Sequence, residues 1–264
     1  MSGLTVAQMF GLPADWIISM APQGTEEWLN ARKGCITGSM AKVARDKLKN
    51  GDPSKPCITY LRDVARERVG AGSGDPVFET AAMRRGTEQE AFARRAYEAR
   101  TGFMVDAAGF VCTPDRKFGV SIDGLVLDDP GKRGGIEIKT LVGSNVLFDA
   151  LVHGDISAYM DQCDMNVWAW CLDWIDLCLW APDLPEPEAR LTVIRIERNQ
   201  DRIDALLADL VQADRMAERF ASELRAFMAS RKATAEPEAA ASQPATAPAS
   251  TSTTASAALV EACF

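Results

Sequence analysis

Two acids and a lysine stand in a segment whose other residues have the pattern of two apolar β-strands. Asp123 follows the run FGVSI, and Glu137 and Lys139 belong to the next run, GGIEIKTL. Side chains alternate between the two faces of a strand, so we expect Glu137 and Lys139 on one face. Ile136 and Ile138 then point into the core. If the two runs pair as a hairpin across the loop DDPGKRGG, Asp123 and Glu137 can approach each other.

This arrangement has two interpretations. Two carboxylates, a backbone carbonyl and water make a site for a hard cation such as Mg²⁺. A lysine beside that site can hold an attacking water or stabilise the charge that builds on a scissile phosphate, which is the chemistry of phosphodiester hydrolysis. The alternative is a half-buried strand that carries its charges on a solvated face. The three residues alone leave both interpretations open.

The composition is that of an ordinary globular protein. The 264 residues are 47% hydrophobic and 25% charged, and the chain is long enough to bury a sizeable core. We expect neither a secretory signal nor a membrane span, because no basic leader or long apolar run is present. The seven cysteines form no C-x-x-C pair, which favours reduced thiols in a cytoplasmic setting. A net charge of −8 predicts that any contact with nucleic acid is confined to a local basic groove.

Periodicity and turn signals predict helices and strands in a mixed order. The predicted helices cover 24–34, 37–48, 54–70, 78–102, 155–172 and 199–232. The predicted strands lie within 103–113, 118–127, 134–141, 174–182 and 190–198. Thr25 is expected to cap the first helix, which Gly34 should end. This order favours a mixed sheet flanked by helices. The tryptophans at 168, 170, 174 and 180 have the spacing of core residues rather than of a base-stacking surface.

The composition changes sharply near the C-terminus. Residues 233–264 are almost all Ala, Pro, Ser and Thr, with few large apolar side chains. Such a segment buries too little surface to offset its ordering entropy. We therefore predict one globular domain over residues 1–232 and a disordered tail over 233–264.

Five stretches of the chain, taken in order, resemble the motifs of the lambda exonuclease (YqaJ-like) family of phage recombinases. They are QGTEEWLNARKGCITGSMAKVA, MRRGTEQEAFARRAYEARTG, the pair SIDG…IEIK, AYMDQCDMNVWAW and TVIRIERNQDRIDAL. The quoted stretches lie between residues 23 and 206. With the remainder of the closing helix, the resemblance covers about residues 23–225, nearly the whole expected globular body. The resemblance implies the PD-(D/E)xK restriction-endonuclease-like fold, an α+β fold in which helices flank a mixed central sheet.

The resemblance also implies roles in metal-dependent hydrolysis. The implied ligands of Mg²⁺, or of Mn²⁺ in its place, are Asp123, Glu137, Glu90 and Ile138. Lys139 would position or activate the attacking water, and Gln162 would contact the metal-bound water or the DNA. The family has a further acid upstream, for which Asp115 is the nearest candidate, although its spacing from Asp123 is shorter than in the family. Without the resemblance, Glu90 and Gln162 would be ordinary polar residues on helix surfaces.

A second group of residues matches the family's pocket for the 5′-phosphate of DNA. These residues are Arg32, Ser39 and Ser121. An arginine offers a bidentate fork for phosphate oxygens, and a serine at a helix start adds a hydroxyl beside backbone amides. Simple N-capping is the alternative for Ser39. A basic run close by either follows the DNA backbone or is a solvated helix face: Lys42, Arg45, Lys47 and Lys49.

The implied activity is 5′-to-3′ exonuclease digestion of double-stranded DNA ends, which leaves 3′ overhangs for phage-type homologous recombination. The family further implies a ring-shaped homotrimer, a single-strand annealing protein as partner, no membrane contact, and the cytoplasm of a bacterial host or phage-infected cell. Two rival functions stay open. One is a PD-(D/E)xK endonuclease that cuts internally, and the other is a non-catalytic recombination protein that binds DNA ends.

Overall fold

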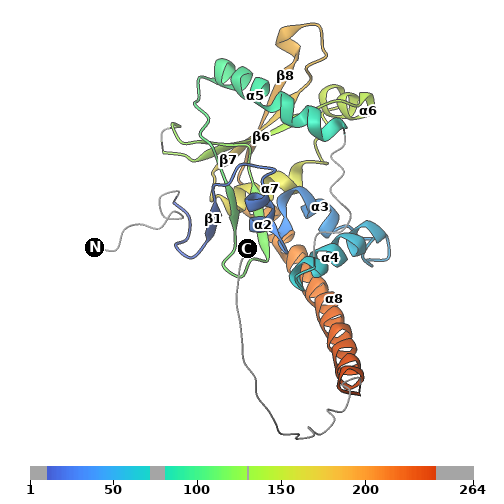
Figure 1. The fold of residues 1–264 in the computed structure, drawn as a ribbon. Coiled ribbons are helices and arrows are strands. Elements are labelled where there is room, and N and C mark those ends of the chain that lie inside the picture. Colours follow the sequence, from blue (N-terminus) through green and yellow to red (C-terminus); the bar gives the residue numbers. More distant parts are fainter. Residues whose placement is uncertain (1–10, 72–80, 130, 242–264) are drawn as a thin grey trace, which may run out of the picture. The chain divides into compact units, whose positions relative to one another are not determined.

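The computed structural model describes residues 11–71, 81–129 and 131–241 (Figure 1). The chain divides into two compact units, Met1–Arg225 and Ala226–Phe264. All the candidate site residues belong to the first unit. No helix in the described part of the chain is long and apolar enough to cross a membrane.

The predicted elements occur in the predicted order, and β1, β2 and α6 are additional to them. The α-helices are α2 (Glu26–Arg32), α3 (Ala41–Ala44), α4 (Lys55–Arg68), α5 (Ala81–Thr101), α6 (Ser144–Leu147), α7 (Met160–Ala169) and α8 (Gln200–Ala241). The strands are β1 (Ile17–Ser19), β2 (Ile36–Thr37), β3 (Phe110–Cys112), β4 (Phe118–Ser121), β5 (Gly124–Val126), β6 (Gly134–Thr140), β7 (Trp174–Trp180) and β8 (Leu191–Glu197). Three single turns complete the order: 3₁₀ helices η1 (Gly38–Met40) and η3 (Pro187–Ala189), and π-helix η2 (Phe148–Val152).

The strands are divided between two mixed four-stranded sheets, with the orders β1-β3-β4-β2 and β5-β6-β7-β8. The β2–β4 and β6–β7 pairs are parallel, and the other pairs are antiparallel. The prediction of a mixed α+β fold flanked by helices is confirmed, but the strands do not form a single central sheet. β4 ends at Ser121 and β5 begins at Gly124. The chain therefore passes from one sheet to the other at Ile122 and Asp123.

The predicted hairpin is confirmed, and its register determines which of the candidate site residues lie opposite each other. Gly124 pairs with Ile136 and Val126 with Gly134 in the antiparallel β5–β6 ladder. Continuing this register by one residue places Asp123 opposite Glu137. The sequence-derived alternation also holds, because Ile136 is fully buried in the hydrophobic cluster that includes α5.

Helices cover both faces of the β5–β8 sheet (Figure 1). On one face, Ile136, Ile138 and Trp174 pack with Ala93 and Tyr97 of α5. On the other face, the packed residues come from β7, α7 and α8 and include Leu177, Leu179, Met165, Ile203 and Leu206. The predicted core role of the tryptophans is confirmed, since Trp170 and Trp174 are fully buried. Glu137 points to the α7 face, where a strand flanked on both sides leaves no solvated surface.

A capping threonine before α2 and a glycine after it define where this helix begins and ends. The Thr25 Oγ1 accepts a hydrogen bond from the Trp28 backbone N–H at 3.3 Å, so the predicted N-cap is confirmed. Gly34 has φ +77°, a left-handed conformation that glycine adopts without strain. The helix predicted over 37–48 is much shorter than expected. It consists of η1 and the four residues of α3, and no side chain caps the start of either, so Ser39 is not an N-cap.

The last helix extends past the predicted domain boundary at residue 232. α8 runs to Ala241, so the start of the segment predicted to be disordered is helical. Alanine and glutamate dominate residues 233–241, and both are strong helix formers. The rest of the predicted tail, 242–264, lies outside the described residues. The six cysteines in the described part are free thiols.

Candidate active site

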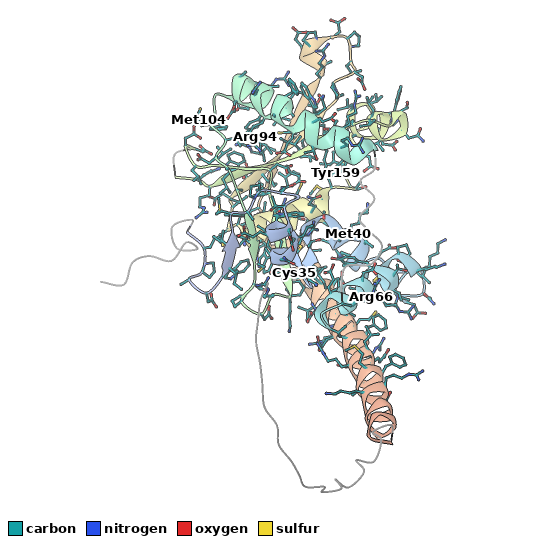
Figure 2. The ribbon with its side chains drawn as sticks, in the orientation of Figure 1. Cys35, Met40, Arg66, Arg94, Met104 and Tyr159 are labelled. Atoms are coloured by element: carbon teal, nitrogen blue, oxygen red, sulfur yellow. The ribbon has the colours of Figure 1, made fainter. Side chains whose placement is uncertain are left out.

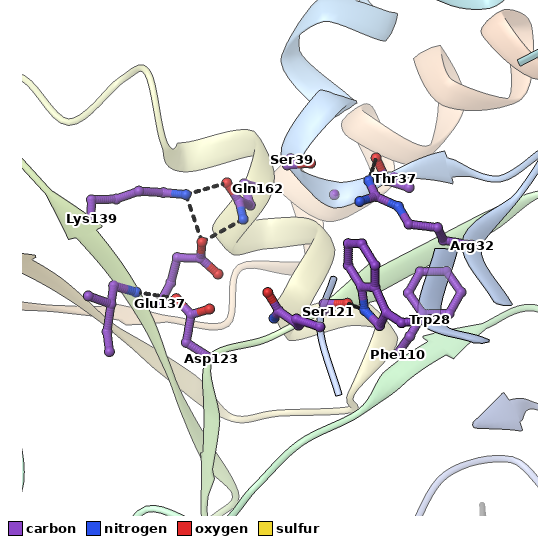
Figure 3. A pocket seen from close by; sticks show the side chains of 13 residues that line it. Trp28, Arg32, Thr37, Ser39, Phe110, Ser121, Asp123, Glu137, Lys139 and Gln162 are labelled. Carbon is purple, nitrogen blue, oxygen red and sulfur yellow. Dashed lines mark hydrogen bonds and ion pairs between the residues drawn. The ribbon is translucent and has the colours of Figure 1, made fainter. Parts of the chain in front are cut away.

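A cavity of about 220 Å³ gathers residues from both sheets, from α2 and α7, and from the 3₁₀ helix η1 (Figure 3). The predicted site residues that line it are Arg32, Ser39, Ser121, Asp123, Glu137, Ile138, Lys139 and Gln162. Figure 3 shows the acids and Lys139 on one side of the cavity and Arg32 on the other. Two groups of residues that the sequence separates by about a hundred positions therefore face one space.

Glu137 is a buried carboxylate held by three donors. Its side chain is 3% exposed, which excludes the solvated-face interpretation. Oε1 accepts from Lys139 Nζ at 2.8 Å and from Gln162 Nε2 at 2.5 Å. Oε2 accepts from Asn166 Nδ2 at 2.8 Å. A buried carboxylate needs such partners, because an unpaired buried charge is costly.

Lys139 and Gln162 also bond to each other. Lys139 Nζ donates to Gln162 Oε1 at 2.9 Å and lies 6.0 Å from the centre of the Tyr159 ring. Burial by itself would lower the pKa of Lys139, but the adjacent carboxylates of Glu137 and Asp123 raise the pKa above its ordinary value. The lysine is therefore a cation at neutral pH, held at the cavity wall.

Asp123 is the second acid of the cavity. Its Oδ2 accepts a hydrogen bond from the Ile138 backbone N–H at 2.6 Å, which ties the residue between the two sheets to β6. Desolvation raises the pKa of Asp123 well above its ordinary value, and the negative charges of Glu137 and Glu90 raise it further. Two neighbouring carboxylates beside a single lysine leave negative charge in the cavity, which favours the binding of another cation.

Glu90 reaches this site through an arginine that sequence reasoning did not single out. Arg94 lies one turn after Glu90 on α5 (Figure 2). Its Nη2 donates to Glu90 Oε1 at 2.8 Å and to the backbone carbonyl of Asp123 at 2.7 Å. Glu90 itself lines a separate hollow over α5 and not the cavity of Glu137. Its i,i+4 spacing to Arg94 was the available signal for this contact.

The opposite side of the cavity carries a half-buried guanidinium. Arg32 lies 4.4 Å from the centre of the Trp28 ring, and its Nη2 donates to Thr37 Oγ1 at 3.4 Å. No carboxylate of the described residues forms an ion pair with Arg32. Desolvation lowers its pKa, although the pKa stays far above neutrality for a guanidinium. Trp28 also donates from Nε1 to Ser121 Oγ at 3.0 Å, so one indole ring contacts two of the three predicted phosphate-binding residues.

Asp115 does not belong to this cavity. It lies in the turn between β3 and β4, and its side chain is 55% exposed. Its carboxylate accepts hydrogen bonds from Thr113 Oγ1 at 2.6 Å and from the Lys117 backbone N–H at 3.2 Å. These bonds stabilise the turn and, despite desolvation, hold the pKa of Asp115 below its ordinary value. Asp115 lies at the tip of the β3–β4 hairpin, whereas Ser121 lies at the other end of β4 and lines the cavity. Asp115 is therefore not positioned to act as the additional acid of the site.

The donor set fits a hard cation on two carboxylates. The described residues contain no group of three or more His, Cys, Asp and Glu side chains spaced to hold a metal ion. Asp123, Glu137 and the backbone of Ile138 line one cavity and offer oxygen ligands only. Mg²⁺ is commonly held by one or two carboxylates, with water and phosphate oxygens completing its shell. The residues therefore fit Mg²⁺ or Mn²⁺, whereas a direct contribution from Glu90 has no support in the geometry.

The basic run that was a candidate for contact with the DNA backbone is partly engaged within the protein. Two of the four residues of the basic run are paired with acids: Arg45 contacts Asp161 at 3.1 Å and Asp209 at 2.6 Å, and Lys47 contacts Asp209 at 2.7 Å. These ion pairs join the loop after α3 to α7 and α8.

Sequence reasoning also missed Asn166, which contacts Glu137. The only signal for this contact in the sequence was the position of Asn166 one turn after Gln162 on α7.

Solved structures that are similar to this chain include exonucleases. The alkaline exonuclease LHK-Exo from Laribacter hongkongensis is 28% identical, with a TM-score of 0.66 over 78% of this chain and 99% of that chain. Its complex with dAMP is 29% identical, with a TM-score of 0.62 over 81% and 99% of the two chains. A phage-related exonuclease from Haemophilus somnus 129PT is 16% identical, with a TM-score of 0.56 over 74% and 96%, and shows the fold alone.

No curated protein sequence matches the chain significantly. Residues 27–169, more than half of the chain, match the YqaJ-like viral recombinase domain. This match begins just before Trp28 and ends at the last residue of α7, so it contains every residue of the cavity from Trp28 to Gln162. The chain therefore belongs to the YqaJ-like viral recombinase family.

Proposed function

We propose that this protein is a metal-dependent exonuclease that degrades one strand of duplex DNA from its 5′ end and leaves a 3′ overhang for recombination. One observation carries the proposal. A single cavity holds the guanidinium of Arg32 on one side and a carboxylate–lysine group on the other. Family membership supports the broader statement that the chain is a nuclease of recombination.

The acidic side of the cavity would carry out hydrolysis. Asp123, Glu137 and the carbonyl of Ile138 would hold Mg²⁺, or Mn²⁺ in its place. When bound, the cation would act as a Lewis acid on the scissile phosphate and lower the pKa of a coordinated water. Lys139 would hold the attacking water and stabilise negative charge that builds on the phosphate. Gln162 would hold the side chains of Lys139 and Glu137 in fixed positions relative to each other, since it forms a hydrogen bond with each of them.

Arg32, Ser39 and Ser121 would bind the terminal 5′-phosphate. Arg32 forms no ion pair with a carboxylate of the described residues, so its guanidinium can bind an anion, and the hydroxyls of Ser39 and Ser121 line the same space. A phosphate monoester occupies such a pocket only at a strand end, so binding there selects ends over internal positions. The Laribacter hongkongensis enzyme forms a complex with dAMP. We propose that the cavity of the present chain releases nucleoside monophosphates.

The assembly and cellular setting belong to the same proposal. By family resemblance the protein would act as a homotrimer that encloses DNA, together with a single-strand annealing protein, in the cytoplasm of a bacterial host or phage-infected cell. The negative net charge of the chain supports a confined contact with DNA rather than a broad basic surface.

The function is tested with linear duplexes that carry a fluorophore at either the 5′ or the 3′ end of one strand. We expect Mg²⁺-dependent loss of the 5′-phosphorylated strand, mononucleotide products and no reaction in EDTA. Covalently closed circular duplex serves as the control and should stay intact. Cleavage of the circle would instead indicate an endonuclease. Binding of ends without turnover in Mg²⁺ or Mn²⁺ would indicate a non-catalytic end-binding protein.

Replacing Arg32 by alanine should remove the preference for a 5′-phosphate. Loss of one charge-assisted contact to phosphate corresponds to about 1.5–3 kcal/mol, or roughly 10- to 150-fold in kcat/KM on phosphorylated ends. The rate on 5′-hydroxyl ends should change little, because those ends lack the group that Arg32 binds. Initial rates on the two duplexes measure the ratio.

Arg32→Lys is the matched variant, since it keeps the charge but not the fork, and it should restore only part of the preference. Equal loss on both kinds of end would contradict a role in binding the terminal phosphate.

A further inference from the structure

We propose that Asn166 is a positioning residue that orients the one Glu137 oxygen still available to ligate the cation. The inference rests on the proposed nuclease function, because it concerns the same cavity. Asn166 does not line the cavity and carries no charge. It would act on the reaction only through Glu137.

The hydrogen bonds of Glu137 show which oxygen is free to act. A carboxylate has two oxygens with about four lone-pair directions in total. Both directions on Oε1 are taken, one by Lys139 Nζ at 2.8 Å and one by Gln162 Nε2 at 2.5 Å. Oε2 receives one donor, Asn166 Nδ2, at 2.8 Å. The remaining direction is therefore on Oε2, which makes it the ligating atom.

Asn166 is itself rigidly placed. It is fully buried on α7, one turn beyond Gln162, so both amides approach the carboxylate from the same helix face. Its Oδ1 has no hydrogen-bond partner among the described residues. That oxygen lies 3.2 Å from the position that a Cβ of Gly38 would occupy, so the glycine leaves room for the amide. The reverse amide orientation would set Oδ1 against Glu137 Oε2, where two acceptors would repel each other.

The chemistry of the donor matters as well as its position. Lys139 neutralises Glu137, whereas the amide of Asn166 fixes Oε2 without cancelling its charge. A hydrogen bond of this kind holds a ligating carboxylate in the correct rotation, and loss of such a bond commonly weakens metal affinity about 10- to 100-fold. The buried, unpartnered Oδ1 indicates that the site tolerates one unsatisfied polar atom to keep the amide there.

The test measures cation affinity separately from cleavage. Mn²⁺ is titrated into the full-length protein and followed by electron paramagnetic resonance or calorimetry. Asn166→Leu removes the donor and keeps the side-chain shape, and we expect Mn²⁺ to bind about 10- to 100-fold more weakly. Asn166→Ala should weaken Mn²⁺ binding to a similar extent, and it replaces the leucine variant in the test if that variant does not fold. Raising the Mn²⁺ concentration should restore most of the cleavage rate, which a general packing defect would not permit.

Met165→Ala is the control, because Met165 is a fully buried neighbour on α7 that does not bond to Glu137. It should lower thermal stability and leave Mn²⁺ affinity unchanged. Wild-type Mn²⁺ affinity in folded Asn166→Leu or Asn166→Ala would overturn the inference. Failure of the wild-type protein to bind Mn²⁺ or to cut DNA would instead overturn the proposed function.

Discussion

Replacing Lys139 by methionine is expected to lower the rate of strand cleavage by about 10²- to 10⁴-fold, the range for loss of a group that positions a proton or stabilises charge in the transition state. Methionine keeps much of the apolar stem and removes only the ammonium. That ammonium lies between Glu137 Oε1 and Gln162 Oε1, with its pKa raised by the neighbouring carboxylates. Single-turnover cleavage of a 5′-phosphorylated duplex in Mg²⁺ measures the change.

The fold should survive this substitution. Glu137 keeps its donors from Gln162 and Asn166, so its carboxylate stays hydrogen-bonded after the lysine is lost. Lys55→Met is the matched control, since Lys55 is an exposed lysine at the start of α4 that does not line the cavity. It should cleave at the wild-type rate. A Lys139→Met rate within threefold of wild type would remove Lys139 from the mechanism.

Replacing Asp123 by asparagine should abolish cleavage with no loss of stability. A ligand that supports Lewis-acid catalysis is worth about 4 kcal/mol or more, so we expect a fall of about 10³-fold or greater in rate. Mn²⁺ binding should weaken in parallel. The asparagine oxygen can still accept the Ile138 N–H, which Asp123 accepts at 2.6 Å. Removal of one of two neighbouring carboxylates also relieves a repulsion that raises the pKa of Asp123.

The thermal unfolding temperature of metal-free Asp123→Asn should therefore equal or exceed that of the wild type, as is common where a site is arranged for function rather than stability. Asp115→Asn is the control for the cleavage assay. Asp115 is an exposed acid in the β3–β4 turn, and its replacement should leave cleavage unchanged. Loss of activity in Asp115→Asn, or full activity in Asp123→Asn, would contradict the placement of the site.

Much of the site could be predicted because its geometry is local. Alternation along a strand places Glu137 and Lys139 on one face, and a hairpin of fixed register places Asp123 opposite Glu137. The capping signal at Thr25 likewise locates α2, and with it Arg32. These relations depend only on backbone periodicity and turn chemistry over short separations, so residue types and spacing are sufficient to state them.

Only the tertiary structure decided which charges are buried and which are paired with each other. Sequence spacing does not distinguish Asp115, which stabilises a turn, from Asp123, which faces the cavity. Nor does it reveal that Arg45 and Lys47 pair with Asp209, more than 160 positions away. The contacts of Arg94 with Asp123 and of Asn166 with Glu137 were hidden for the same reason.

The chain by itself thus determined the elements, the hairpin and the chemical types of the central residues. Packing of helices on both faces of the β5–β8 sheet decided that Glu137 is desolvated and needs three donors. The chain passes from one sheet to the other at Asp123, and this passage brings Asp123 into the same cavity as Arg32. Burial and charge pairing depend on segments that are distant along the chain. They are set when the whole fold excludes water, which no local pattern specifies.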